Sequence, residues 1–403
     1  MRLDSIAIVG ASLAGLEAAK ELRTSGFAGE LVVFGAEPQL PYDRPPLSKE
    51  LLTGQVGADQ VRLDLGPAAD AAWHVSARVT RMDAHKRALT VDGVTEMFDG
   101  IVIATGATPR RPAFARAHAY LAGVHVVRTL DDCLALADDL RGCPGRVLVV
   151  GGGFIGAEVA SSCRALGLEV TVVEGLGAPM ERALGHQMGQ ILGEIQREHG
   201  VDLRVGTTVL DIDGAGRVGR ARLSDDTVLD VDVVVLATGV QPATDWLADS
   251  GLQLENGVLC DQTCLAAPGI VAAGDVARWP NPRSGELRRV EHWDNAIRQG
   301  RHAARRLLAG DDPADREPYA PVPWVWSDQF GGKLQAIGST AQHDEFRIVS
   351  GGLAAGKLAG AYRRGDRLAG LVGLNSARTV IAARELLMNG ATWAQALDRL
   401  NSR

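Results

Sequence analysis

Long apolar runs are missing from this 403-residue sequence, and none approaches the roughly 18–20 residues that a membrane-spanning helix needs. Asp4 stands where a secretory signal peptide would carry its apolar stretch. Cysteine is scarce, with five residues, and none of them form a C-x-x-C pair or the framework of a small secreted domain. We therefore expect a soluble protein that is not exported and that works in a reducing cytoplasm.

An excess of positive charge is also missing. Lys and Arg number 42 against 49 Asp and Glu, a net charge of −7, so the overall charge does not favour a nucleic-acid partner. His and Cys do not cluster at zinc spacing, and the cysteine patterns of iron–sulfur proteins are absent, so no metal site is expected. The length predicts two or three domains.

Glycine, in contrast, is abundant, with 48 residues concentrated after β-branched apolar runs. Two such junctions are almost alike, residues 6–15 (IAIVGASLAG) and 147–156 (VLVVGGGFIG). Each precedes a helical stretch and then a second apolar strand, at residues 16–24 and 31–35 in the first case and 157–166 and 170–174 in the second. This order predicts two βαβ units, and hence an α/β fold with two Rossmann-like, doubly wound dinucleotide-binding domains.

Later segments complete the expected architecture. Residues 101–108 and 233–240 are apolar strands that end in Ala-Thr-Gly and return the chain to its neighbouring domain. Residues 269–275 form a third apolar strand that ends on an aspartate. The Pro-rich, acidic residues 313–323 indicate a linker, and a small α+β C-terminal domain with a helix at 376–388 follows.

The second unit carries the stronger nucleotide-binding signal. Gly151, Gly153 and Gly156 satisfy G-x-G-x-x-G between the expected strand and helix, where backbone N–H groups and the helix dipole favour a pyrophosphate. Glu174, 23 residues after Gly151, ends the next strand, where a carboxylate accepts hydrogen bonds from both adenosine ribose hydroxyls. This carboxylate favours NAD over NADP, although Arg182 could adapt the site to a 2′-phosphate. The alternative is a glycine turn without a ligand.

The first unit departs from this fingerprint. Gly10 and Gly15 are present, but Ser12 stands in place of the middle glycine. A small side chain is tolerated if the pyrophosphate sits slightly farther out, and Glu37 follows the second strand as a candidate ribose acceptor. Alone, this unit is a weak indication of a dinucleotide.

Four segments together resemble one family. They are residues 41–49 (PYDRPPLSK), 269–278 (GIVAAGDVAR), 291–299 (EHWDNAIRQ) and 322–329 (VPWVWSDQ). The family is the FAD-dependent NADH:ferredoxin reductases of bacterial oxygenase systems, which serve Rieske-type dioxygenases and class I cytochromes P450 and belong to the glutathione-reductase-like superfamily. The resemblance covers essentially the whole chain in the right order, and the first and last segments are its narrowest signals.

The resemblance implies three domains and two sets of cofactor contacts. The implied domains are an FAD-binding domain (1–108 and 243–319), an NAD-binding domain (109–242) and a C-terminal interface domain (320–403). The implied FAD contacts are Gly10, Ser12, Ala14, Gly15, Glu37, Arg44, Lys49, Val79, Thr105, Gly106, Arg128, Asp275, Trp293 and Trp326. The implied NAD contacts are Gly151, Gly153, Phe154, Ile155, Gly156, Glu158, Glu174, Arg182 and Gly239. For Asp275 the alternative is a helix N-cap, and for Trp293 it is a core aromatic.

Lys49 and Glu158 form the sharpest implied pair. In the superfamily a lysine and a glutamate meet beside flavin N5, the atom that accepts hydride, and these two positions correspond. Such a buried charge pair would orient the nicotinamide and tune the flavin without transferring a proton itself. The alternative is a structural salt bridge between domains. Trp324 and Trp326 correspond to the part of the family's C-terminal domain that covers the flavin, with core packing as the alternative.

The route of the electrons away from the flavin follows from missing cysteines. Residues 41–52 contain none, and Cys260 and Cys264, spaced C-x-x-x-C, lie outside the sites where disulfide reductases of the superfamily carry theirs. The expected acceptor is therefore external, and the family resemblance implies that it is a [2Fe–2S] ferredoxin. Arg298, Arg301 and Arg305 recur at i, i+3 and i+7 of an expected helix at 293–308, and this arginine face is a candidate docking patch for an acidic ferredoxin. The alternative is an ordinary solvated helix face.

Other acceptors and one different class of function stay open. A rubredoxin reductase, or a reductase of a quinone or an organic radical, would use the same two cofactors. A protein resembling apoptosis-inducing factor would instead use its NADH–FAD complex as a conformational signal, but its relatives usually carry targeting or extra basic segments that this sequence lacks. The sequence does not decide between a monomer and a homodimer.

Overall fold

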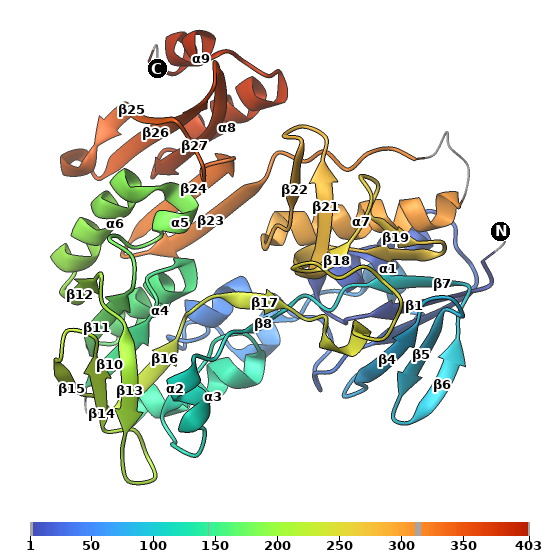
Figure 1. Ribbon diagram of the computed structural model, residues 1–403, viewed down its shortest axis with the longest axis horizontal. Helices are drawn as coiled ribbons and strands as arrows, with labels where there is room; N and C mark the ends of the chain where they lie inside the picture. The colour runs from blue at the N-terminus through green and yellow to red at the C-terminus, as the bar shows by residue number, and fades with distance from the viewer. Residues whose placement is uncertain (1–2, 144, 311–315, 402–403) are drawn as a thin grey trace. The chain divides into compact units, whose positions relative to one another are not determined.

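The computed structural model describes residues 3–143, 145–310 and 316–401 (Figure 1). The chain divides into two compact units. The first comprises the described residues of Met1–Asp43, Asp59–Thr108 and Val240–Pro323, and the second those of Arg44–Ala58, Pro109–Gly239 and Trp324–Arg403. Within the described residues, none of the helices combines the length and apolar character that a membrane span requires.

A six-stranded sheet forms the centre of the first unit, in the order β19-β20-β7-β1-β2-β3. Its strands pair in parallel except β19, and Ile6 and Ile8 of β1 are fully buried, as expected for a strand covered on both faces. The strands are β1 (Ser5–Val9), β2 (Glu30–Phe34), β3 (Ala72–His74), β7 (Gly100–Ile103), β19 (Leu265–Ala267) and β20 (Ile270–Ala272). The helices α1 (Leu13–Thr24) and α7 (Trp293–Ala309) pack closely against each other beside this sheet.

Two small antiparallel elements complete the first unit. One is a meander of β4 (Val79–Asp83), β5 (Ala88–Val91) and β6 (Val94–Met97). The other contains β18 (Val258–Leu259), β21 (Ala277–Asn281) and β22 (Glu286–Arg288). Two further short strands, β8 (Ala107–Pro109) and β17 (Val240–Pro242), pair where the chain leaves and re-enters this unit.

The second unit contains a parallel sheet in the order β12-β11-β10-β16-β9. Its strands are β9 (Val124–His125), β10 (Arg146–Val150), β11 (Glu169–Glu174), β12 (Val201–Val205) and β16 (Val233–Leu236). The accompanying helices are α2 (Ala113–Ala117), α3 (Leu130–Arg141), α4 (Phe154–Ala165), α5 (Glu181–Leu184) and α6 (His186–Glu198). A three-stranded element of β13 (Val209–Asp213), β14 (Arg220–Leu223) and β15 (Val228–Asp230) packs into the same core.

The C-terminal part of the second unit is an antiparallel sheet with two helices. The sheet order is β23-β24-β27-β26-β25, from β23 (Trp324–Gln329), β24 (Gly332–Gly338), β25 (Glu345–Gly352), β26 (Lys357–Arg364) and β27 (Arg367–Leu374). The helices are α8 (Ala377–Met388) and α9 (Trp393–Asn401) (Figure 1). Side chains of this sheet share one apolar cluster with α4, α5 and α6, which explains why the segments belong to one compact unit.

The predicted fold class is confirmed, with two Rossmann-like sheets and a C-terminal domain of antiparallel strands. Both glycine-turn helices begin three residues earlier than expected, because the helix starts within the turn itself. The strand expected at 269–275 ends at Ala272, and Asp275 lies in the short 3₁₀ turn Gly274–Val276 that follows. Helix α9 was not predicted. The expected linker lies partly outside the described residues, and the three-domain division stays a prediction.

Candidate functional site

The turn between β10 and α4 has the geometry of a nucleotide-binding turn. Gly151 has φ +107°, and a Cβ there would lie 2.4 Å from the carbonyl oxygen of Ala237. A Cβ on Gly156 would lie 2.0 Å from the carbonyl oxygen of Gly151, so strand and helix approach each other closely. Protein packing therefore requires both glycines.

Gly153 is different, because among the described residues other than its two chain neighbours no heavy atom lies within 4 Å of the place where its Cβ would be. Gly153 is the N-cap of α4, has no side chain that could cap the helix, and the first turn of α4 carries no acidic residue. The amides of this helix end are thus open to an anion on the side where glycine leaves room. These observations fit a dinucleotide pyrophosphate.

The corresponding turn in the first unit explains the substitution at Ser12. A Cβ on Gly10 would lie 2.2 Å from the carbonyl oxygen of Ala104, and a Cβ on Gly15 would lie 1.9 Å from the carbonyl oxygen of Gly10. These are the same close contacts as those of Gly151 and Gly156 in the second unit. Ser12 is the N-cap of α1 with φ −115°, a conformation that any residue adopts. The middle glycine of the motif is thus replaceable as far as the backbone is concerned.

Glu174 lies at the end of β11 beside the second turn. One carboxylate oxygen accepts a hydrogen bond from the N–H of Gly152 at 2.7 Å, and the other accepts one from the N–H of Leu176 at 2.9 Å. The side chain is half-buried, so it is held at the turn while it keeps some access to solvent. Arg182 is exposed on α5, and the carbonyl oxygen of Gly239 accepts a hydrogen bond from Arg110.

The two apolar NAD candidates lie in the first turn of α4. Phe154 is half-buried and packs against the apolar cluster that α4 shares with the C-terminal sheet. Ile155 is 44% exposed. An exposed isoleucine at this end of the helix leaves an apolar surface accessible to a ligand.

Lys49 and Glu158 lie together in the second unit, as expected. Lys49 Nζ lies 3.1 Å from Glu158 Oε2, and their side chains are only 12% and 5% exposed. Ser48 donates its hydroxyl to the same oxygen at 2.5 Å, and Ser327 of β23 donates to Oε1 at 2.6 Å. The buried carboxylate therefore receives donors from residues 48 and 49, which precede α3, and from the C-terminal sheet. The two serines were not singled out from the sequence.

Other predicted FAD residues of the second unit also gather. Arg44 donates a hydrogen bond from its guanidinium to the carbonyl oxygen of Arg128. The rings of Trp324 and Trp326 are stacked with centroids 5.0 Å apart and planes 25° from parallel, and both residues are half-buried. Because they alternate along β23, they present one aromatic surface on one face of the sheet.

In the first unit the remaining FAD candidates lie in loops, at strand ends and at the starts of helices. Tyr42 donates its hydroxyl to the carboxylate of Glu37, and Trp293 donates its indole N–H to Asp43 at 2.7 Å. Thr105 donates its hydroxyl to the carbonyl oxygen of Ala243 at 2.9 Å. The other members of the group are Ala14, buried in α1, Val79, buried at the start of β4, and Gly106, with φ +69°.

A buried polar network that the sequence did not reveal supports the turn that holds Asp275. Gln299 accepts hydrogen bonds from the backbone N–H of Gly274 at 3.0 Å and from the side chain of Asn295 at 3.1 Å. Asn295 in turn accepts the hydroxyl of Tyr319 at 3.0 Å. The turn is thus fixed from within the core of the first unit.

The cysteines offer no redox pair. Cys260 and Cys264 are buried and free, as are Cys133 and Cys163, while Cys143 is free and half-buried. Burial raises the pKa of the Cys264 thiol to about 12 and that of Cys260 well above its ordinary value. A buried thiol with so high a pKa is a poor nucleophile, so neither residue is suited to disulfide exchange.

The arginine face is largely neutralised by acidic neighbours. Arg298 pairs with Asp294 at 2.8 Å, and Arg305 pairs with Glu21 of α1 at 2.9 Å. Arg301 donates its Nε–H to Glu17 of α1 at 2.7 Å. The three arginines are about half exposed, and their docking role stays a prediction.

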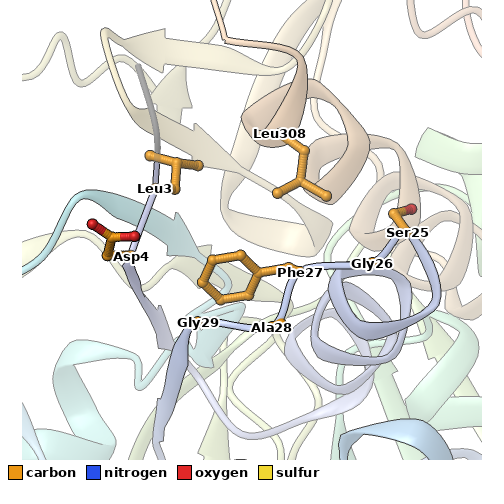
Figure 2. A pocket seen from close by; sticks show the side chains of 8 residues that line it. All are labelled: Leu3, Asp4, Ser25, Gly26, Phe27, Ala28, Gly29 and Leu308. Atoms are coloured by element: carbon orange, nitrogen blue, oxygen red, sulfur yellow. The ribbon is translucent and has the colours of Figure 1, made fainter.

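A surface pocket lies at the other end of the first sheet (Figure 2). Asp4 lies just before β1 and Gly29 just before β2, with Phe27 and Leu308 beside them, so the pocket is at the amino ends of these strands. Doubly wound folds bind nucleotides at the carboxyl ends. The pocket is therefore not a second candidate for the dinucleotide. Among residues 3–143, 145–310 and 316–401, no three His, Cys, Asp or Glu side chains gather to hold a metal ion.

The two dinucleotide turns are typical of oxidoreductases with two dinucleotide-binding folds. The chain belongs to the pyridine nucleotide-disulphide oxidoreductase family, whose model matches residues 4–300. It is an oxidoreductase that binds FAD and NAD(H). A second family model, reductase C-terminal, matches residues 324–399.

Relatives narrow this class further. The chain is 37% identical over 392 residues to the rhodocoxin reductase of Rhodococcus erythropolis, covering 95% of this chain and 89% of the relative. It is 36% identical over 406 residues to the ferredoxin–NAD(+) reductase component of the anthranilate 1,2-dioxygenase system of Burkholderia cepacia, covering 97% and 96%. The reductase in the covalent putidaredoxin reductase–putidaredoxin complex superposes with a TM-score of 0.91 at 27% identity, covering 99% of this chain and 98% of that chain.

Proposed function

We propose that this chain is an NADH-dependent flavoprotein reductase that passes electrons from NADH through FAD to a [2Fe–2S] ferredoxin. The ferredoxin in turn serves a cytochrome P450 or a Rieske-type oxygenase. The observation that carries the proposal is the buried ion pair between Lys49 and Glu158, a residue of α4, the helix that follows the dinucleotide turn. Relatives named as ferredoxin–NAD(+) reductase components of dioxygenase systems support the choice of acceptor.

In this proposal each turn holds one cofactor. The turn at Gly10–Gly15 in the first unit, with Glu37, Asp275 and Trp293, binds FAD, and the turn at Gly151–Gly156 binds NADH. Glu174 accepts the ribose hydroxyls of NADH and disfavours the 2′-phosphate of NADPH. FAD, when bound, supplies the chemistry of accepting two electrons as hydride and releasing them singly.

Other residues of the second unit orient the nicotinamide and keep water away from the reaction. Lys49 and Glu158 fix the nicotinamide for transfer while neither side chain exchanges a proton. The stacked Trp324 and Trp326 give this unit an aromatic surface of the kind that excludes water from a bound cofactor. Because the buried thiols do not react, the electrons leave for an external protein. We also propose the cytoplasm as the place of this reaction, which the five free cysteines support.

The test is anaerobic mixing of the FAD-loaded protein with NADH, followed by mixing with candidate acceptors. We expect fast flavin bleaching by NADH, slower bleaching by NADPH, and rapid turnover with a [2Fe–2S] ferredoxin measured through cytochrome c. Faster turnover with rubredoxin or a quinone than with the ferredoxin would show that the ferredoxin is not the acceptor. A long-lived NADH complex with negligible ferricyanide turnover would favour the signalling protein, and protein that takes up no flavin would refute the proposal.

A further inference from the structure

Ser327 and Gln329 are polar residues buried in a strand where apolar side chains would be the ordinary choice. Ser327 is 0% exposed and Gln329 is 6% exposed. A buried polar group costs stability unless it is hydrogen-bonded, so the partners of these side chains indicate their purpose. Both side chains alternate onto the same face of β23, the face that meets α4.

The hydrogen bonds of the two residues form a directed chain that ends on Glu158. The amide Nε2 of Gln329 donates to Ser327 Oγ at 3.1 Å, so Ser327 uses its own hydrogen to donate to Glu158 Oε1 at 2.6 Å. Within the described residues, Ser327 is the one donor to Oε1. Lys49 and Ser48 both act on the other oxygen, Oε2.

A second contact fixes the end of β23 on the same helix. The backbone N–H of Phe330, next to Gln329, donates to the hydroxyl of Ser161 in α4 at 2.7 Å. The strand therefore cannot slide along α4 without breaking two hydrogen bonds. Ser327 is thus held in register with Glu158, and not merely near it.

From this arrangement we infer that Ser327, supported by Gln329, is a positioning residue for the Glu158 carboxylate. The C-terminal sheet holds the orientation in which Glu158 pairs with Lys49, and so sets the efficiency of hydride transfer from NADH. The inference rests on the proposed function. It gives the C-terminal domain a part in the reductive half-reaction, in addition to any part in partner binding.

The experiment is a double-mutant cycle on the FAD-loaded protein, with Ser327→Ala and Glu158→Ala alone and together. In single-turnover mixing with NADH, we expect Ser327→Ala to slow flavin reduction about tenfold, which equals about 1.4 kcal/mol. The absorbance of the charge-transfer complex between NAD⁺ and reduced flavin should weaken as well. In the Glu158→Ala background, Ser327→Ala should change the rate less than twofold, because the carboxylate on which it acts is gone.

Two further variants keep the test decisive. Gln329→Leu should produce a smaller loss in the same direction, and it replaces Ser327→Ala if that variant does not fold. Ser376→Ala is the matched control, since Ser376 is equally buried in the C-terminal domain but donates only to the carbonyl oxygen of Leu374. Its rate should match the wild type.

Three results would overturn the inference. An unchanged rate and charge-transfer band in Ser327→Ala, while the wild type reduces ferredoxin, would refute the positioning role alone. An equal loss in both backgrounds would show that Ser327 acts structurally and not through Glu158. A wild-type protein that NADH does not reduce would overturn the proposed function itself.

Discussion

Glu174 provides the sharpest test of coenzyme choice. In the proposed complex its carboxylate accepts hydrogen bonds from the ribose hydroxyls of NADH, and hydrogen bonds to a charged group contribute about 1.5–3 kcal/mol. Removing the carboxylate in Glu174→Ala should therefore raise the KM for NADH about 10- to 100-fold. The KM for NADPH should stay level or fall, because the negative charge facing its 2′-phosphate is also removed.

The carboxylate has a second role that the experiment must separate. It accepts the N–H groups of Gly152 and Leu176, so its loss also leaves two turn amides without their partner. A distorted turn would weaken both coenzymes alike, whereas the ribose role changes their ratio. Glu174→Gln, which removes the charge but keeps an amide oxygen as acceptor, should disturb the turn less and still reduce the preference for NADH.

The assay is steady-state oxidation of NADH and NADPH with ferricyanide, which does not require the protein partner. Glu169→Ala is the control, because Glu169 starts the same strand at its exposed end, away from the turn. A ratio of the two KM values that stays within twofold of the wild type in Glu174→Ala would refute the ribose role.

Three further predictions concern other parts of the chain. Converting Cys260 and Cys264 together to Ser should leave NADH-dependent ferredoxin reduction within about twofold of wild type, since buried thiols of high pKa do not exchange; a large loss would revive a disulfide mechanism. Changing the arginine face to Gln should raise the KM for ferredoxin and flatten its salt dependence while ferricyanide reduction persists, and equal loss with both acceptors would remove the docking role. Asp99 accepts hydrogen bonds from the N–H groups of Asp4 and Ser5, which hold its pKa below its ordinary value, so this stabilisation is present above the ordinary pKa and is lost as pH falls through the lowered one. Asp99→Asn should thus lower Tm by a few degrees at pH 7 and by progressively less below about pH 4. Thermal melts that show the same decrease in Tm at pH 7 and below about pH 4 would contradict this.

The fold was predictable because its strongest signals are local. The sequence signal of each βαβ unit lies in one continuous segment, where a β-branched run, a glycine turn and a helix follow one another. The close approach of Gly10 to Ala104 and of Gly151 to Ala237 explains why glycine marks both turns. The predicted last helix, residues 376–388, matches α8 alone, and helix α9 was missed because no helix was predicted for the short segment after it.

The arginine face shows what a local sequence pattern leaves out. Spacing within one helix correctly placed three arginines together, but it could not show what lies opposite them. Glu17 and Glu21 belong to α1, far earlier in the chain, and recur at the spacing that matches Arg301 and Arg305 of α7. Charge on a helix is thus a sequence property, whereas the field it projects depends on tertiary neighbours.

The Glu158 cluster extends this argument to the candidate site. Lys49 and Glu158 were expected together only because family resemblance linked two distant positions, and nothing in either local segment implies a third partner. Ser327 reaches Glu158 across 169 residues of sequence, through a strand whose other conspicuous residues are two tryptophans. The sequence does not distinguish a buried serine from an exposed one. The role of Ser327 becomes visible only in the folded structure, where packing excludes water and leaves the Glu158 carboxylate as its acceptor. Sequence patterns therefore locate the charged members of such a site, while the neutral hydroxyls that orient them require the folded structure.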